Sequence, residues 1–362
     1  MGRFGNGPPL TPALSPPRGE GVYIRVYLCS FVVGLSFKRM DSFGRTVDYL
    51  RISITDRCNE RCLYCLPENY ADWLPRGEIL AYDELLAIVR ATTALGFKRF
   101  RVTGGEPLIR PGVVEFIRDL IATPGVESVL LTTNGTRLPQ LAQPLFDAGL
   151  RRVNISLDAI DPAIYRTITN GDVAPVLAGI KLVKELGFES VKLNTVLMRG
   201  KNDGEVFRLL DFAAEHDIAI RFIELMPVSL TEMLSEKNFF PVTELFAKLQ
   251  RDDELEPLTE SFGFGPAKYY RLKRRGATVG LIGALSDLHF CERCNKMRLT
   301  CDGKLRPCLG NHLETDLKPA LRPQIDAALL RELVCNTLVQ KPAEHLFREN
   351  YQPQRVMTAI GG

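Results

Sequence analysis

The chain has 362 residues, of which 45% are hydrophobic and 25% are charged, and its formal net charge is +3. This composition is ordinary for a soluble globular enzyme, and the length suggests roughly two domains. The net charge is too small to indicate nucleic acid as a partner, although a local excess of Lys and Arg can still bind an anionic small molecule. Six of the nine cysteines form two tight clusters. This pattern indicates metal ligands in a reducing compartment rather than disulfides, so the cytoplasm is the expected location.

The first 40 residues differ from the rest of the chain. The run GNGPPLTPALSPPRGEG is rich in Pro and Gly and has little to bury, so residues 1–40 are predicted to be disordered or not translated, with Met40 as the true start. The apolar stretch 23–37 contains Arg25 and is shorter than the roughly 18 to 20 residues that span a bilayer. No membrane association is therefore expected.

From residue 41 onward, short β-branched runs alternate with helical stretches. The runs predict six strands, at 49–55, 99–103, 128–133, 152–157, 190–196 and 220–225. Between them, as in YDELLAIVRATTALG, apolar residues recur at spacings of three and four. This repetition predicts an α/β fold with a parallel sheet and helices outside, either an open doubly wound sheet or a barrel. In both cases the chemistry is expected at the carboxyl ends of the strands.

Three cysteines follow the first predicted strand in the run TDRCNERCLYCLPEN: Cys58, Cys62 and Cys65. Their spacing allows one loop to curl three sulfurs around a single centre, and soft thiolates select iron-sulfur clusters, zinc or copper(I). Three ligands leave one iron of a cubane cluster free to bind another molecule, whereas a structural zinc site usually has four protein ligands. Three unpaired thiols, or a zinc site completed from far away, are the alternatives.

Polar residues also occur at the other predicted strand ends. They lie in TGGEPLIR (103–110), TTNG (132–135), SLD (156–158), the pair Lys192 and Asn194, and ELMP (224–227). Each is weak alone, and the GGEP run by itself favours an ordinary tight turn. Together they predict a polar site at one end of the sheet.

A second group of three cysteines lies in CERCNKMRLTCDGKLRPCL: Cys291, Cys294 and Cys308. Cys301 in the same run would complete a four-cysteine site, so the spacing alone leaves zinc open as an alternative to an iron-sulfur cluster.

The first cysteine loop, with Tyr64 before its third cysteine, and the GGEP turn resemble the radical S-adenosylmethionine enzymes. More narrowly, DxFGRxxxYLRISxTDRCNxRCxYC, RVTGGEPLIR, LTTNG, NISLD, VKLNTV and RFIELMP resemble the GTP 3',8-cyclase family of molybdenum cofactor biosynthesis, over residues 41–362. The resemblance implies an incomplete (βα)6 TIM-like barrel over 41–250 and a C-terminal extension over 251–362 that binds a second cluster and the substrate. A peptide-modifying radical enzyme with an auxiliary iron-sulfur cluster and a non-enzymatic zinc-binding module remain as alternatives.

The same resemblance implies two 4Fe-4S clusters, S-adenosylmethionine as cofactor and GTP as substrate, converted to 3',8-cyclo-7,8-dihydroguanosine 5'-triphosphate in the first step of molybdopterin biosynthesis. The implied cluster ligands are Cys58, Cys62, Cys65, Cys291, Cys294 and Cys308. The implied S-adenosylmethionine contacts are Tyr64, Gly105, Ser156 and Met226. The implied GTP contacts are Arg51, Arg101, Thr132, Lys192, Lys296, Met297 and Arg298. Lys296 stands where the family usually has Arg, which puts a bidentate contact there in doubt.

Other expectations follow from the resemblance. The C-terminal Gly361 and Gly362 are expected to reach into the active site and to have a catalytic role. Flavodoxin or ferredoxin is the expected electron donor, cyclic pyranopterin monophosphate synthase the expected recipient of the product, and a homodimer the expected assembly. Neither nucleic acid nor a membrane is an expected partner.

Overall fold

The computed structural model describes residues 39–231, 233–259, 264–349 and 351–362. Most of the predicted disordered segment, residues 1–38, lies outside the described residues. Residues from Arg39 to Gly362 form one compact unit. The division at residue 250 therefore remains a prediction. No helix in the described parts of the chain combines the length and the apolar character needed to cross a membrane.

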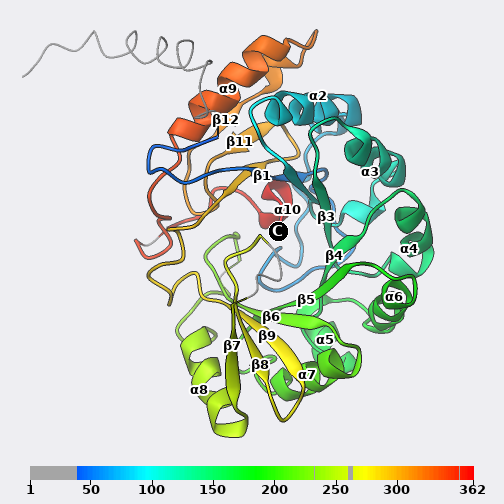
Figure 1. Ribbon diagram of the computed structural model, residues 1–362, viewed down its shortest axis with the longest axis vertical. Coiled ribbons are helices and arrows are strands. Elements are labelled where there is room, and N and C mark those ends of the chain that lie inside the picture. Colours follow the sequence, from blue (N-terminus) through cyan, green and yellow to red (C-terminus); the bar gives the residue numbers. More distant parts are fainter. Residues whose placement is uncertain (1–38, 232, 260–263, 350) are drawn as a thin grey trace, which may run out of the picture. The chain divides into compact units, whose positions relative to one another are not determined.

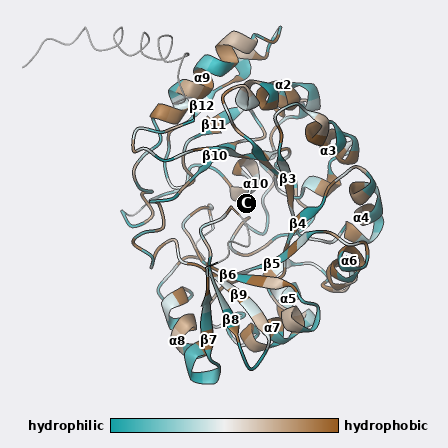
Figure 2. Ribbon diagram, viewed as in Figure 1, coloured by the Kyte–Doolittle hydropathy of each residue, from teal (hydrophilic) through white to brown (hydrophobic). Residues whose placement is uncertain are grey.

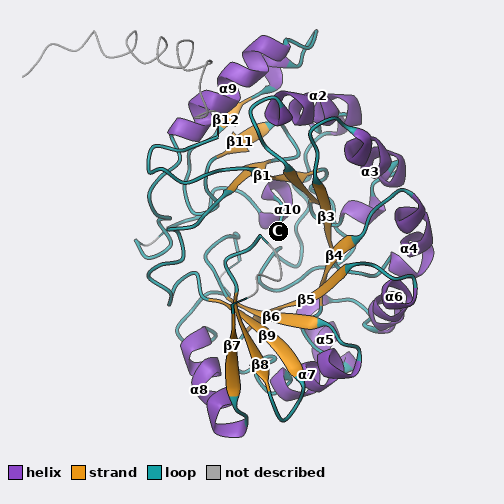
Figure 3. Cartoon of the chain, in the orientation of Figure 1, coloured by secondary structure: helices purple, strands orange, loops and turns teal. Residues whose placement is uncertain are grey.

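All six predicted strands form, and they lie side by side in chain order in a parallel arrangement. They are β1 (Tyr49–Ser53), β2 (Arg99–Thr103), β3 (Ser128–Thr133), β4 (Arg152–Ser156), β5 (Ser190–Leu197) and β6 (Ala219–Glu224). The helices between them are α2 (Tyr82–Thr93), α3 (Val113–Ala122), α4 (Leu138–Asp147), α5 (Pro162–Thr169), α6 (Ala174–Glu185) and α7 (Val206–Glu215). Figures 1 and 3 show these helices on the outside of a strongly curved sheet. The predicted incomplete, TIM-like α/β barrel is confirmed.

Successive residues of each strand point alternately to the core between sheet and helices and to the inner face of the barrel. In β1, Leu50 and Ile52 are fully buried in the core between sheet and helices, whereas Arg51 points to the other face. The helices are amphipathic and pack their apolar side on the same core. Figure 2 shows both hydrophilic and hydrophobic residues on the strands. The inner face of the barrel is left to polar side chains.

The segment after residue 250 extends both edges of this sheet. β9 (Ala277–Ile282) pairs in parallel with β6, and β10 (Lys296–Leu299) pairs in parallel with β1. Beyond them, antiparallel pairing adds β8 (Lys268–Leu272) and β7 (Leu255–Leu258) at one edge, and β11 (Lys304–Arg306) and β12 (Thr315–Asp316) at the other. The twelve-stranded sheet stays open between β12 and β7. The remaining helices are α8 (Val242–Asp252), α9 (Ala327–Val339) and α10 (Met357–Ile360).

The sequence patterns did not predict these added strands. β10 reads KMRL, with two cations in four residues, and β12 has only two residues, so neither has the apolar run that marks a strand. Pairing with an existing sheet edge, rather than their own composition, makes them strands. The C-terminal residues return to the inside of the arc, where Figure 1 shows α10 and the chain end at the centre.

Candidate active site

The first cysteine triplet lies in the loop after β1, at the carboxyl end of the barrel. Burial raises the pKa of the Cys58 and Cys62 thiols, and raises that of Cys65 to about 12. The Glu60 backbone N–H donates to the Cys58 sulfur, and the Thr358 backbone N–H donates to the Cys65 sulfur. Such donors stabilise thiolates that a metal centre has deprotonated, and hydrogen bonds to sulfur are a common feature of iron-sulfur sites.

The second triplet lies at the opposite end of the barrel. Because Tyr49 pairs with Lys296 in the parallel β1–β10 register, Cys294 precedes β10 at its amino end. The antiparallel β10–β11 hairpin then returns the chain, and continuing its register places Cys308 opposite Lys296. The three thiols Cys291, Cys294 and Cys308 are close enough to interact electrostatically. They too receive backbone N–H donors, from His345, Lys296 and Gly310 respectively.

Cys301 does not lie with the second triplet. It occupies the turn of the β10–β11 hairpin, at the carboxyl end of β10, where its N–H donates to the carbonyl oxygen of Ala359 at 3.2 Å. Its buried side chain is in an apolar cluster against which Cys58 and Cys65 pack. The hairpin thus separates Cys301 from Cys294, so it is not placed as a fourth ligand of a zinc site with Cys291, Cys294 and Cys308.

No group of three His, Cys, Asp or Glu side chains within the described ranges is gathered tightly enough to hold a single metal ion. The fit of the two triplets to clusters therefore rests on their spacing and on the N–H donors to their sulfurs, rather than on a preformed single-ion geometry.

The GGEP turn is built to approach the first cysteine loop closely. The N–H groups of Gly105 and Glu106 donate to the carbonyl oxygens of Thr55 (2.7 Å) and Arg57 (2.8 Å). A Cβ at Gly105 would lie 2.2 Å from the Arg57 oxygen, so only glycine fits there. The buried Glu106 carboxylate accepts from the Thr133 hydroxyl at 2.7 Å, which links the end of β2 to the end of β3. Burial raises its pKa to about 7.

The residues implied to contact S-adenosylmethionine all lie at carboxyl ends of strands or in the loops after them. The Tyr64 hydroxyl donates to Asp158 at 2.7 Å, which holds the first cysteine loop to the end of β4. Ser156 ends β4, opposite Asn194 of β5. Met226 follows β6 and packs against an apolar cluster that includes Phe347. The same end of the barrel therefore carries these residues and the first triplet.

Cationic side chains occupy the middle of the barrel, between the two triplets. The register aligns Arg298 of β10, Arg51 of β1 and Arg101 of β2 in one row across the sheet. Lys296 lies two residues before Arg298 on the same face. Lys192 of β5 and Arg221 of β6 lie close enough to each other and to Arg101 to interact electrostatically.

None of these six cations forms an ion pair with an Asp or Glu side chain in the described part of the chain. The six are Arg51, Arg101, Lys192, Arg221, Lys296 and Arg298. Burial, followed by the repulsion of neighbouring cations, lowers the pKa of Arg51. The same causes lower the pKa of Lys192 to about 7. The buried Nε of Arg51 has no hydrogen-bond partner. Buried charge without a counter-charge is unfavourable, so this interior is matched to a polyanion.

Neutral partners hold the cations in place. Arg101 donates to the Tyr49 hydroxyl and, at 2.9 Å, to the Thr132 hydroxyl. Arg221 donates to Asn194 Oδ1 at 2.8 Å. Register, electrostatic proximity and the Arg101–Thr132 hydrogen bond together place the predicted residues in one region: Arg51, Arg101, Thr132, Lys192, Lys296 and Arg298. Met297 differs, because its side chain is buried in the hydrophobic core and only its main chain is left for the interior.

Arg221 is a site residue that the sequence patterns did not single out. An arginine inside the apolar strand RFIEL was the available signal. Its neighbour in the sheet is Gly280, where a Cβ would lie 2.9 Å from Arg221 Cγ. Glycine at this position of β9 therefore makes room for the guanidinium stem.

The C-terminal glycines lie against the same row of arginines. Arg51 and Thr103 donate to the terminal oxygen of Gly362, the latter at 2.9 Å, and Arg298 donates to the carbonyl oxygen of Gly361 at 2.5 Å. Gly361 has φ +90°, and a Cβ there would lie 2.6 Å from Thr103 Cγ2. The tail thus enters the barrel where only glycine is accommodated.

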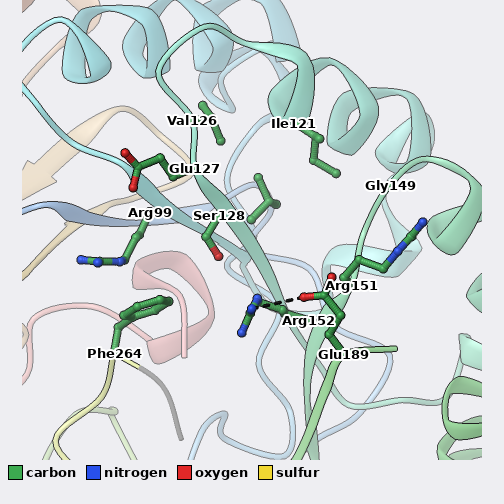
Figure 4. A pocket seen from close by; sticks show the side chains of 11 residues that line it. Arg99, Ile121, Val126, Glu127, Ser128, Gly149, Arg151, Arg152, Glu189 and Phe264 are labelled. Atoms are coloured by element: carbon green, nitrogen blue, oxygen red, sulfur yellow. Dashed lines mark ion pairs between the residues drawn. The ribbon is translucent and has the colours of Figure 1, made fainter. Parts of the chain in front are cut away.

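Two cavities adjoin at the amino ends of the central strands, with volumes of about 320 and 620 Å³. Arg152 and Glu189, paired at 3.2 Å, line both cavities, as Figure 4 shows for the smaller one. Arg99 and Phe264 also line the smaller cavity, and Lys192 lines the larger. The cationic interior is therefore accessible from the end opposite to the first triplet.

Comparison with known proteins identifies the family. The Radical SAM superfamily model matches residues 52–213, and the Molybdenum Cofactor Synthesis C model matches residues 218–347. The chain is 42% identical over 324 residues to the GTP 3',8-cyclase of Pelotomaculum thermopropionicum, a match that covers 89% of this chain and 99% of the relative. It is 43% identical over 323 residues to that of Moorella thermoacetica, with 89% and 99% coverage.

Solved structures agree on the fold. SuiB of Streptococcus suis bound to S-adenosylmethionine matches with a TM-score of 0.53 at 15% identity, over 75% of this chain and 63% of that one. SuiB bound to its precursor peptide SuiA matches with a TM-score of 0.58 at 15% identity, over 91% and 73%. At this identity the likeness shows the fold alone. The sequence relatives are decisive, and the chain belongs to the GTP 3',8-cyclase family of radical S-adenosylmethionine enzymes.

Proposed function

We propose that this protein converts GTP to 3',8-cyclo-7,8-dihydroguanosine 5'-triphosphate, the first step of molybdopterin biosynthesis. The observation that carries the proposal is the group of six cations, without an Asp or Glu partner among the described residues, between two cysteine triplets at opposite ends of one barrel. A nucleoside triphosphate supplies the negative charge that this interior lacks. The name shared by the relatives supports GTP as that nucleotide.

Each triplet fits a 4Fe-4S cluster with one open iron. Cys58, Cys62 and Cys65 are the proposed ligands of the first, and Cys291, Cys294 and Cys308 those of the second. When bound, the first cluster and S-adenosylmethionine supply a reactive primary carbon radical upon one-electron reduction. The protein supplies position and exclusion of water, because such a radical attacks any carbon–hydrogen bond within reach.

The residues around each triplet divide the binding task. Tyr64, Gly105, Ser156 and Met226, near the first triplet, are proposed to bind S-adenosylmethionine, with Asp158 fixing Tyr64 through its hydroxyl. Lys296, Arg298 and the main chain of Met297, beside the second triplet, are proposed to orient GTP. Arg51, Arg101, Thr132, Lys192 and Arg221 are proposed to hold its triphosphate.

The C-terminal glycines are proposed to complete the active site. Their main-chain oxygens already accept hydrogen bonds from Arg51 and Arg298, two of the cations proposed to bind GTP. Bound substrate and tail therefore compete for, or share, the same guanidinium groups. A tag appended after Gly362 would displace these contacts, and cyclisation is expected to fall while cleavage of S-adenosylmethionine persists.

The cellular setting is part of the proposal. Flavodoxin or ferredoxin would deliver the electron, cyclic pyranopterin monophosphate synthase would take the product, and the protein would act in the cytoplasm as a homodimer. The eight free cysteines of the described residues agree with a reducing compartment.

Anaerobic incubation of the reconstituted protein with S-adenosylmethionine, dithionite and GTP tests the function. Formation of 5'-deoxyadenosine is expected together with loss of GTP and formation of the cyclic nucleotide, and ATP in place of GTP should give no such product. If 5'-deoxyadenosine forms while GTP is not consumed, the substrate is wrong. If the purified protein contains zinc and no sulfide, the radical chemistry itself is excluded.

A further inference from the structure

Lys341 is a buried lysine at the second triplet that no sequence motif singled out. Its side chain is only 2% exposed, and it follows α9, far in the chain from all three cysteines. Lysine is rarely buried without a partner of opposite charge. No carboxylate in the described residues forms an ion pair with it, so another group must supply the negative charge opposite its ammonium.

Two hydrogen bonds place the Lys341 ammonium beside two of the three cysteines. Nζ donates to the carbonyl oxygen of Lys296 at 2.8 Å and to that of Pro307 at 2.7 Å. Lys296 comes two residues after Cys294, and Pro307 comes directly before Cys308. The ammonium is also close enough to the Cys294 and Cys308 sulfurs to interact with them electrostatically. Lys341 thus bridges the two strands that carry two of the three proposed ligands.

The segment that carries Lys341 is itself anchored to the third ligand. The Arg45 guanidinium donates to the carbonyl oxygens of Ala343 at 2.7 Å and Cys291 at 3.1 Å, and also to that of Pro342. Arg45 is held in turn by Asp41, with Nε 2.5 Å from its carboxylate. The backbone on both sides of the ammonium is therefore fixed relative to the triplet.

We propose that Lys341 is a positioning residue of the second cluster: the carbonyl oxygens of Lys296 and Pro307 hold its ammonium beside Cys294 and Cys308, where it stabilises the negative charge added when the cluster is reduced. The inference rests on the proposed function only in requiring a cluster at Cys291, Cys294 and Cys308. In a buried site a fixed positive charge beside the sulfur favours the more negative state, so it raises the reduction potential. One electron enters from the reductant, and no proton transfer is needed.

The test isolates the second cluster in full-length protein with Cys58→Ala, Cys62→Ala and Cys65→Ala. Its midpoint potential is measured by dithionite titration followed by electron paramagnetic resonance, alone and with Lys341→Met or Lys341→Arg. Lys341→Met is expected to move the potential to a more negative value, and Lys341→Arg to leave it near the unsubstituted one. Lys248→Met is the matched control, because Lys248 also donates to a carbonyl oxygen, that of Asp203, but does not contact a cysteine.

A measurement without substitution of Lys341 covers the case in which Lys341→Met does not fold. Protein grown with lysine labelled by ¹⁵N at Nζ is expected to show hyperfine coupling of that nitrogen to the reduced second cluster. The coupling should vanish in labelled Lys341→Arg, which retains Lys296.

The outcomes separate cleanly. Three results would each overturn the role of Lys341 without affecting the proposed function. They are an unchanged potential in Lys341→Met, equal effects of Lys341→Met and Lys341→Arg on potential or cluster content, and the absence of a hyperfine coupling that depends on Lys341. Absence of iron and sulfide from the triple alanine protein overturns the second cluster itself, and with it the proposed function.

Discussion

At the scale of single residues, the interior of the barrel conflicts with simple folding rules. Arg51, Lys192 and Arg221 are withdrawn from water without an Asp or Glu partner in the described residues, and burial lowers the pKa of each. Such positions are unfavourable in the free protein and become favourable when a polyanion enters. The local violation of folding rules therefore indicates the binding site.

The lowered pKa of Lys192 predicts that GTP binding depends on pH. Its pKa of about 7 lies below the ordinary lysine value, so at pH 8 the free protein holds it mostly neutral. Bound triphosphate favours the ammonium, so GTP binding at pH 8 should take up most of one proton, and affinity should weaken as pH rises above 7. Calorimetry in buffers of different ionisation enthalpy measures the uptake.

Lys192→Arg is the control for this prediction, because an arginine stays charged at pH 8. The uptake should then disappear while GTP still binds. Equal proton uptake in both proteins would assign the titration to another group.

Gly361 tests the placement of the tail. In Gly361→Ala a Cβ would meet Thr103 Cγ2 at 2.6 Å, and a non-glycine residue at φ +90° costs roughly 1–2 kcal/mol. The tail should shift and cyclisation should fall by about 100-fold, as misplacement by about an ångström does, while 5'-deoxyadenosine still forms. Product and 5'-deoxyadenosine are quantified in the same reaction.

Gly204→Ala is the matched change, because nothing lies within 4 Å of a Cβ at Gly204 and its φ is not positive. It should leave both products unchanged. If Gly361→Ala behaves in the same way, the tail has no role in the reaction.

At the scale of elements, the β10–β11 hairpin determines at which end of the barrel each of its cysteines lies. Its two strands carry Cys294 and Cys308 toward one end of the barrel, and its turn places Cys301 at the other. In the linear sequence these cysteines are neighbours. The strand length separates them in space, and this separation removes the four-cysteine zinc alternative.

Cys301→Ala and Cys294→Ala should therefore differ in metal content. The first should retain the iron and sulfide of the unsubstituted protein, because Cys301 contributes apolar packing and a weak hydrogen bond at the first triplet's end. The second should lose about half of both, since one of two equal clusters loses a ligand. Iron and sulfide assays measure this, and an equal loss in both variants would return Cys301 to the ligand set.

At the scale of the whole molecule, one barrel holds two cysteine triplets at opposite ends with the cations between them. Extension of the sheet by β10 at one edge and β9 at the other creates this arrangement, since β10 aligns its residues with β1 and β9 aligns its residues with β6. The two ends can therefore be disabled separately.

Cys58→Ala should abolish 5'-deoxyadenosine formation, because Cys58 is a proposed ligand of the first cluster. Cys294→Ala should keep part of that formation and lose cyclisation, because the damage lies at the other end of the barrel. Anaerobic turnover with S-adenosylmethionine, dithionite and GTP measures both products. Equal loss of both in the two variants would contradict separate roles for the ends.

The sequence by itself determined the six central strands, the helices between them and the two cysteine triplets. Strand and helix patterns repeat over short distances, and the C-x3-C-x2-C spacing and the GGEP turn are local, so a linear pattern carries them. The motif resemblance also indicated the family that the sequence relatives confirm.

Only the tertiary structure decided which triplet lies at which end, where Cys301 lies, and which cations face one another. Sheet register places Arg298 beside Arg51, although 247 positions separate them in the chain. Register also explains why no sequence pattern identified Arg221 and Lys341 as site residues, since the residues around them come from distant parts of the chain. Register and pairing are long-range properties, set by the packing of the whole sheet rather than by the residues next to each site.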